Sequence, residues 1–334
     1  MTKSGNNNGL TDIKGIMVGH YTSVAAASGV TVILCTAGAV GGVDVRGSAP
    51  GTRETDLLAP LNLVEKVQGV VLSGGSVFGL SAADGVVRWL AQRGWGFPLA
   101  AGEVVPIVPA AALFDLGRGK DYVPPIGPEW GVRACESAST GSIAVGCVGA
   151  GTGALSGIIK GGIGSASELL GSGLTVAALV AVNSLGSVIN PTTGVPWEVH
   201  QEVNREFGML GRRAVKLPHV TDPVSPSNTT IGVIATDAAL TKAQAQKVAQ
   251  MAHDGLARAI RPAHTMFDGD TIFCMATGEH DLPDATGFFT VAKAEALNEL
   301  GRAAADCMSR AIVRAVLEAH SMGEISAFRD LQPL

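Results

Sequence analysis

Short apolar segments recur along the chain and end near glycine or asparagine, a pattern typical of buried β-strands. Their residues are mostly valine, isoleucine, alanine and threonine, and the β-branched ones favour extended backbone. The pattern predicts strands at residues 31–35, 69–73, 142–148, 175–182, 229–236 and 271–276.

Apolar residues at helical spacing lie between and after these strands. Residues 80–92 carry an apolar stripe at three- and four-residue steps, as in an amphipathic helix. Thr241 and Gln244 form a capping box, which predicts a helix over residues 242–260. The same steps predict a last, long helix over residues 291–320.

This mixture of strands and helices predicts an α/β or α+β layered fold. No shift in composition, proline-rich linker or block of charge divides the 334 residues, so we expect a single domain. Two long uncharged stretches, residues 137–159 and 169–197, are interrupted by glycine and small polar residues. We interpret them as buried strands and turns rather than membrane-spanning helices.

Composition narrows the class of protein. With 24 basic and 29 acidic residues, the chain lacks the positive charge that a nucleic-acid-binding protein needs. Five scattered cysteines without a CxxC spacing favour reduced thiols in a cytoplasmic protein, and the polar start does not resemble a secretion signal. Glycine is unusually frequent, at 44 residues, which favours tight turns and close backbone packing.

The junction Asn228-Thr229 carries the most specific candidate chemistry. Residues 212–227 are rich in proline and predict a long exposed loop, after which the chain passes directly into the apolar strand. The Thr229 hydroxyl could attack the carbonyl of Asn228, giving an ester that water opens. The new N-terminal threonine would then hold a hydroxyl nucleophile and an α-amine base. By spacing alone, the simpler interpretation, that these residues just begin a strand, is favoured.

Two further features could contribute to a site. Asp268 and Asp270 lie immediately before a predicted strand, where paired carboxylates could orient an amine or could simply form a turn. Lys160 lies among apolar residues and glycines. It could stabilise an oxyanion or lower the pKa of a neighbour, or it could point into solvent.

No motif predicts a bound cofactor or metal. Residues 149–153 are rich in glycine but complete neither a dinucleotide-binding pattern nor a P-loop. The seven histidines, among them His253, His264 and His280, show no paired metal-ligand spacing. We therefore expect a protein without metal or cofactor.

The segment at residues 44–56, DVRGSAPGTRETD, is long and distinctive. Together with residues 73–79, 149–164 and 228–235, it closely resembles the DmpA-type family of self-cleaving amidohydrolases. That family includes L-aminopeptidase/D-esterases, β-peptidyl aminopeptidases and nylon-oligomer hydrolases. The likeness covers almost the whole chain, with the motifs in the expected order.

The resemblance implies an α+β fold, a four-layer αββα sandwich related to ornithine acetyltransferase. It implies that one precursor is cut into an α chain, residues 1–228, and a β chain, residues 229–334. Family members are usually homo-oligomers of the processed unit, often tetramers, so we expect the same here. Neither a membrane nor a nucleic acid is expected as a partner.

The resemblance also assigns roles to individual residues. Thr229 falls on the nucleophile and Asn228 on the residue before the cut, and this Asn-Thr pair is similar to that of the nylon-oligomer hydrolases. Asn183 matches an asparagine that supports the oxyanion. Such a donor can stabilise a transition state by about 2.7–4 kcal/mol.

Lys160 matches a lysine placed beside the nucleophile in the nylon-oligomer branch. Asp268 and Asp270 match an acidic pair of that branch, expected to hold the Thr229 amine. Phe114 departs from the pattern, since it stands where relatives carry tyrosine, and is a candidate substrate-binding residue. Without the hydroxyl, either another donor replaces it or activity on small amides is reduced.

These features predict an autocleaved, N-terminal-threonine hydrolase of linear amide oligomers, acting on a small amide or peptide substrate through an acyl-enzyme on Thr229. An aminopeptidase or D-amino-acid esterase-amidase, which needs a free substrate amine, is the first alternative. An acyltransferase and an uncleaved, non-catalytic binding protein are the others.

Overall fold

The computed structural model describes residues 2–218, 228–282 and 291–334. Four α-helices are found in this part of the chain: α1 (Ala82–Ala91), α2 (Pro128–Glu136), α3 (Lys242–Ala259) and α4 (Val291–Leu317). The longer strands are β1 (Met17–Ser23), β2 (Ser28–Val45), β4 (Lys66–Ser73), β10 (Gly162–Leu169), β11 (Thr175–Asn183), β12 (Thr229–Ala238) and β13 (Thr271–His280). The short strands are β3 (Gly51–Arg53), β5 (Phe97–Pro98), β6 (Val104–Val105), β7 (Ala110–Ala112), β8 (Leu155–Ser156) and β9 (Ile159–Lys160).

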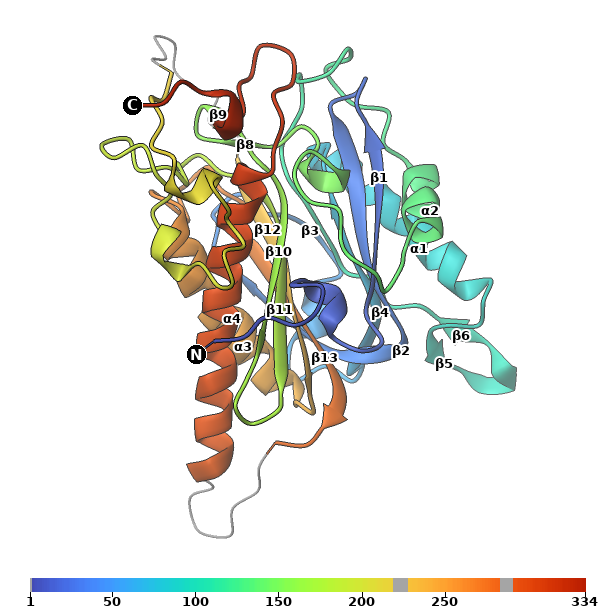
Figure 1. The fold of residues 1–334 in the computed structure, drawn as a ribbon. Coiled ribbons are helices and arrows are strands. Elements are labelled where there is room, and N and C mark those ends of the chain that lie inside the picture. The colour runs from blue at the N-terminus through green and yellow to red at the C-terminus, as the bar shows by residue number, and fades with distance from the viewer. Residues whose placement is uncertain (1, 219–227, 283–290) are drawn as a thin grey trace.

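Nine strands form one continuous sheet in the order β10-β11-β12-β13-β2-β4-β7-β3, with β1 added to β2 (Figure 1). The long strand β2 joins two halves of this sheet, because its first part pairs with β4 and its last part with β13. Between these parts the register shifts from Leu34 to Ala39, and Gly38 takes a left-handed φ of 78°. Glycine adopts that conformation without the steric cost that a Cβ would add.

The two halves of the sheet pack face to face across an apolar core. Side chains alternate along each strand, so β11 sends Ala177, Leu179 and Ala181 into this core and the intervening residues to the other face. Both faces of β11 are therefore buried, which explains why its sequence is apolar throughout. The opposite layer contributes Ile33, Val70 and Leu72 to the same core.

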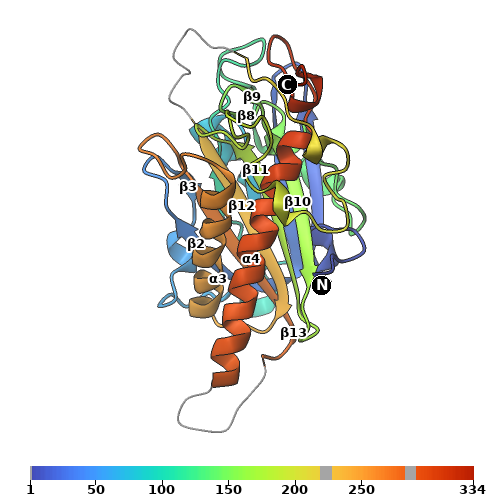
Figure 2. The ribbon, with the colours of Figure 1, turned by 60° about the vertical axis from the view of Figure 1, so that its left-hand side comes forward.

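Helices cover the two outer faces. Helices α3 and α4 lie side by side over β10–β13 (Figure 2), while α1 and α2 pack against β2 and β4. The order helix, sheet, sheet, helix confirms the expected four-layer αββα fold. In the described ranges, no helix combines the length and the apolar character needed to span a bilayer.

Most predicted elements are confirmed with small changes of boundary. The capping box at Thr241 is present, with Gln244 N–H donating to the threonine oxygen. The predicted strand at residues 142–148 is wrong. Gly146 there has a φ of 83°, and its Cβ position would lie 2.4 Å from the carbonyl oxygen of Glu318, so this segment runs as a loop against the end of α4.

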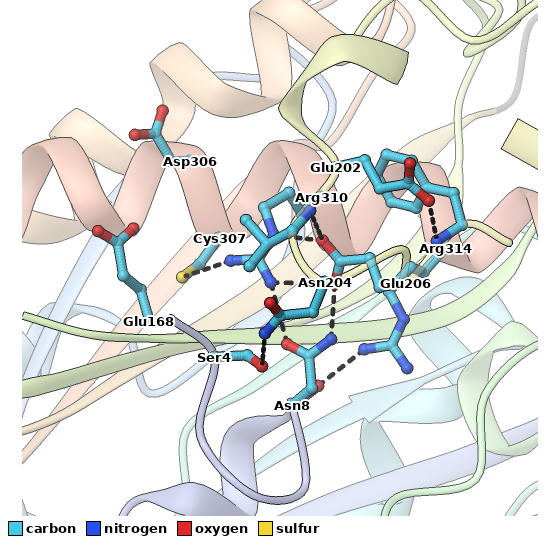
Figure 3. Close-up of polar contacts among 12 residues, drawn as sticks. Ser4, Asn8, Glu168, Glu202, Asn204, Glu206, Asp306, Cys307, Arg310 and Arg314 are labelled. Atoms are coloured by element: carbon cyan, nitrogen blue, oxygen red, sulfur yellow. Dashed lines mark hydrogen bonds and ion pairs between the residues drawn. The ribbon is translucent and has the colours of Figure 1, made fainter. Parts of the chain in front are cut away.

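A buried polar cluster ties α4 to the N-terminal segment (Figure 3). The Arg310 guanidinium pairs with Glu206 at 2.5 Å, and the two side chains are 1% and 4% exposed. Arg310 also donates to the Asn8 side chain and to the carbonyl oxygen of Ser167. The charge of this buried arginine is thus compensated by groups distant in sequence.

Candidate active site

Three strand ends bring the predicted site residues together. Thr229 begins β12 and is the register partner of Asn183, the last residue of antiparallel β11. On its other side β12 pairs in parallel with β13, so the segment that enters β13 lies at the same end. That segment contains the Asp268-Gly269-Asp270 turn, and Asn228 forms a parallel bridge with Asp268.

The Thr229 hydroxyl lies against the peptide bond that it is predicted to cut. Its oxygen donates to the carbonyl oxygen of Asn228 at 2.5 Å and accepts the Gly269 N–H at 3.2 Å. Both Asn228 and Thr229 are nearly buried, at 2% and 4% exposed. A Cβ on Gly269 would lie 2.9 Å from the Thr229 hydroxyl oxygen, so glycine allows this close approach.

The two carboxylates have different environments. Asp270 accepts the Thr230 N–H at 2.8 Å on one oxygen, and the His264 N–H and Nδ1 on the other. Asp268 accepts the Thr265 N–H at 2.8 Å through Oδ2. Within the described residues, its buried Oδ1 has no hydrogen-bond partner. Burial, and next the neighbouring Asp270 charge, raise the pKa of Asp268.

The distinctive segment at residues 44–56 holds this acidic turn through its backbone. The N–H groups of Arg46 and Gly47 donate to the carbonyl oxygen of Asp270, at 3.0 and 3.2 Å. Ala49 N–H donates to the carbonyl oxygen of Asp268 at 2.9 Å. The motif that carried the resemblance therefore acts as a backbone clamp on the turn.

Asn183 is fully buried and its amide makes three hydrogen bonds. Its Oδ1 accepts from the Arg118 guanidinium at 2.5 Å and from the Leu155 N–H at 3.0 Å. Its Nδ2 donates to the carbonyl oxygen of Phe114 at 2.9 Å. Burial lowers the pKa of Arg118 to about 10, against the opposing effect of the Asp115 carboxylate.

Lys160 is 1% exposed and does not reach solvent. Its ammonium donates to the carbonyl oxygens of Thr152 and Ala154, each at 2.8 Å. Burial lowers its pKa to about 8. Among the described residues it forms no hydrogen bond or ion pair with Thr229.

A cavity of about 500 Å³ opens beside Thr229. Its walls combine apolar groups, such as Val77, Phe114 and Phe267, with the hydroxyl residues Ser76 and Thr229. None of the described residues that line it carries a charge. Phe114 thus lies where substrate would contact it, whereas Asp268 and Asp270 are not part of the wall.

Arg118 and His264 were missed by the sequence analysis. Each touches a predicted site residue, Asn183 and Asp270 respectively, through contacts that depend on the folded arrangement. His264 was noted only for its lack of metal-ligand spacing. No local pattern in the sequence distinguishes either residue.

Comparison with known proteins identifies the family of the chain. The sequence profile of Peptidase family S58 matches residues 8–328. The chain belongs to Peptidase family S58. It is therefore an amide-bond hydrolase of the DmpA type, as the resemblance implied.

Two relatives in this family have different names. An uncharacterized aminopeptidase of Mycobacterium leprae is 47% identical, over 98% of this chain and 94% of its own. A 6-aminohexanoate-oligomer endohydrolase of Kocuria sp. is 30% identical, over 91% of this chain and 84% of its own. Sequence similarity therefore extends to both an aminopeptidase and an oligomer hydrolase.

Solved structures of two aminopeptidases share the fold. A Burkholderia sp. beta-aminopeptidase matches with a TM-score of 0.71 and 26% identity, over 95% of this chain and 88% of its own. The L-aminopeptidase D-Ala-esterase/amidase of Ochrobactrum anthropi, described as a variant of the Ntn hydrolase fold, matches with a TM-score of 0.73. That match has 22% identity and covers 98% of this chain and 92% of the other.

Proposed function

We propose that this S58 hydrolase is cut by its own Thr229 and then uses Thr229 to hydrolyse linear amide oligomers. The observation that carries the proposal is the 2.5 Å contact between the Thr229 hydroxyl and the Asn228 carbonyl oxygen, at the wall of the cavity. One hydroxyl is thereby close both to the peptide bond to be cut and to the space for substrate.

Self-cleavage would proceed in two balanced steps. The Thr229 oxygen attacks the carbonyl carbon of Asn228, and the hydroxyl proton passes to the Thr229 nitrogen as the C–N bond breaks, which leaves an ester. Water then adds to this ester, releases the Asn228 carboxyl group and restores the Thr229 hydroxyl. Residues 1–228 and 229–334 become separate chains of one folded unit.

In the processed enzyme, the turn formed by Asp268, Gly269 and Asp270 would bind the new α-amine of Thr229. Cleavage creates an α-amine at Thr229, next to the β-bridge that joins Asn228 to Asp268. The Oδ1 of Asp268, which has no hydrogen-bond partner among the described residues, would accept a hydrogen bond from this amine. The amine then takes the hydroxyl proton as Thr229 attacks the substrate carbonyl carbon, and gives a proton to the leaving amine.

The Asn183 amide is the candidate donor for the oxyanion, and it now donates to the carbonyl oxygen of Phe114, a residue of the cavity wall. The Gly269 N–H donates instead to the Thr229 hydroxyl oxygen, the nucleophile itself. Transfer of the Asn183 Nδ2 hydrogen bond from Phe114 to the substrate would stabilise the negative charge. Lys160 acts at longer range in this scheme, as a buried positive charge that interacts electrostatically with Arg118 and Asp115.

Among the described residues the lining of the cavity carries no charge, and this supports an oligomer substrate over a free aminoacyl one. A substrate ammonium would need a carboxylate in the wall, because an unpaired buried charge is costly. The carboxylates of Asp268 and Asp270 accept hydrogen bonds from the backbone of Thr265 and Thr230 and are outside the described lining. Uncharged methylene segments would instead pack on Val77, Phe114 and Phe267.

We also propose that the processed unit assembles into a homo-tetramer in the cytoplasm. Four of its five free cysteines are buried, which agrees with thiols that stay reduced. Light scattering of the processed protein tests the assembly.

Intact mass spectrometry of purified protein tests the cleavage. We expect two fragments divided after Asn228 in the wild type and one uncut chain in Thr229→Ala. A wild-type chain that stays whole after long incubation, as an uncleaved binding protein would, contradicts the proposal.

Substrate choice is tested with an amino-acid p-nitroanilide and its N-acylated form. We expect the acylated form to be hydrolysed at least as fast, because no carboxylate that could select a free amine lies among the described residues of the wall. A strong preference for the free amine would favour an aminopeptidase. A rate that depends on an added amine acceptor would favour an acyltransferase.

A further inference from the structure

We propose that His264 is a positioning residue, which fixes the orientation of the Asp270 carboxylate beside the nucleophile. The inference rests on the proposed function of Thr229 and adds a residue that neither the motifs nor the spacing of the chain indicated. Its basis is the set of contacts that surround Asp270.

Asp270 is held from two sides. Its Oδ1 accepts the N–H of Thr230, the residue that follows the nucleophile, at 2.8 Å. Its Oδ2 accepts the backbone N–H of His264 at 3.1 Å and the ring Nδ1 of His264 at 2.8 Å. The carboxylate is 2% exposed, so water contributes little to its orientation. His264 therefore supplies the one side-chain donor in this set.

The contacts around Asp270 assign the donor role to His264. Both oxygens of Asp270 already accept backbone N–H groups, so we assign His264 Nδ1 as the donor of the 2.8 Å contact. The other ring nitrogen, Nε2, is buried and has no hydrogen-bond partner among the described residues. His264 thus has its donor directed at Asp270 and no second polar contact through its ring.

A second histidine holds the ring of His264 in place. The ring of His253 packs edge-on against it, with centroids 4.9 Å apart. His253 is fully buried, and its Nε2 lies 3.1 Å from the carbonyl oxygen of Asp44, to which it donates. Asp44 begins the clamp segment, so the histidine pair and the clamp support the same acidic turn.

The backbone of His264 also has an unusual conformation. Its φ is 56°, in the left-handed region that most side chains avoid and in which asparagine and histidine are enriched. This conformation directs both the backbone N–H and the ring Nδ1 of one residue to the same carboxylate oxygen. Asparagine can adopt it too, and its Nδ2 stands at the branch position of the histidine Nδ1.

Because asparagine can share the backbone conformation and the donor position of His264, two matched variants are available. His264→Asn keeps a donor for Asp270, whereas His264→Gly accepts the same backbone conformation and removes the donor. His280→Ala is the control, because His280 is exposed at the far end of β13. Self-cleavage is followed by intact mass, and kcat and KM are measured on an N-acyl p-nitroanilide.

We expect His264→Gly to lower kcat and the self-cleavage rate at least ten-fold, with KM within two-fold of wild type. Fold changes of this order correspond to one lost hydrogen bond. We expect His264→Asn to recover most of that loss. A merely structural role would lower the melting temperature and leave kcat of the folded fraction unchanged. That result, or equal kcat values in the Gly, Asn and wild-type proteins, overturns the inference.

A double-variant cycle isolates the route through Asp270. In an Asp270→Asn background, His264→Gly should lower kcat by less than a further two-fold, since the partner of His264 is already altered. A full additional ten-fold loss means that His264 acts elsewhere and overturns the inference. Failure of the wild type itself to cut or to hydrolyse contradicts the proposed function instead, so the two failures are distinguishable.

Discussion

Gly47 is the closest point of contact between the clamp segment and the acidic turn, and Gly47→Ala tests whether that contact matters. An added Cβ would lie 2.2 Å from the backbone nitrogen of Asp270 and 2.3 Å from the carbonyl oxygen of Asp268. Both neighbours are backbone atoms, which cannot rotate away as a side chain would. The two segments must therefore separate by about 1 Å to reach ordinary van der Waals contact.

That separation would weaken the three N–H···O bonds that Arg46, Gly47 and Ala49 make to the turn. At about 1 kcal/mol each, we expect the free energy of unfolding to fall by about 3 kcal/mol. We expect a larger effect on the rate of self-cleavage. A displacement of about 1 Å can lower a rate on the order of 100-fold. The carboxylates of Asp268 and Asp270 would no longer be held in their positions beside Thr229.

The assay follows self-cleavage by intact mass and unfolding by urea titration. Gly171→Ala is the matched control, since nothing lies within 4 Å of its Cβ position and its φ lies outside the left-handed region. We expect the control to behave as wild type and Gly47→Ala to cut about 100-fold more slowly. A folded Gly47→Ala protein that cuts at the wild-type rate would refute the role of the clamp.

Three further predictions concern buried groups. Burial lowers the pKa of Lys160 from 10.5 to about 8. Between pH 8 and pH 10.5 the unfolded chain therefore binds this proton more tightly than the folded chain does. The free energy of unfolding should rise by about 3 kcal/mol from pH 8 to pH 10.5, and urea titration should show no such contribution in Lys160→Met. Asn183→Ala should lower kcat by about 100- to 1000-fold with little change in KM, and an unchanged kcat would exclude it from oxyanion binding. Glu206→Gln leaves Arg310 without its counter-charge and should cost about 3–5 kcal/mol in urea titrations, while kcat of the folded protein is unchanged.

Strand and helix positions could be predicted where the pattern was long and unambiguous. The β11 and β12 segments are apolar because both of their faces are buried, and the capping box marked the beginning of α3. The strand predicted at residues 142–148 is wrong for a different reason. Apolar content there reflects contact with α4 in a loop, and the left-handed backbone of Gly146 ends any extended run.

The candidate site was predicted mainly through the family resemblance. Thr229, Asp268 and Asp270 lie in local patterns, a junction and a turn, which by themselves favour simpler interpretations, and the fold brings these residues together. The contacts of Arg118 with Asn183 and of His264 with Asp270 arise from loops whose course depends on the register of distant strands. The predicted loop at residues 212–227 lies largely outside the described residues, which end at 218 and resume at 228.

The buried pair of Arg310 and Glu206 has a consequence for folding kinetics. Cleavage after Asn228, as proposed, would leave the carboxylate on one fragment and the guanidinium on the other. The uncut chain forms this pair in a unimolecular reaction, whereas the separated fragments would have to find each other. Refolding of the processed protein should therefore become second order, with a rate that rises with concentration, while refolding of Thr229→Ala stays first order. The covalent link would be needed once, for assembly, and the buried charges would keep the product together afterwards.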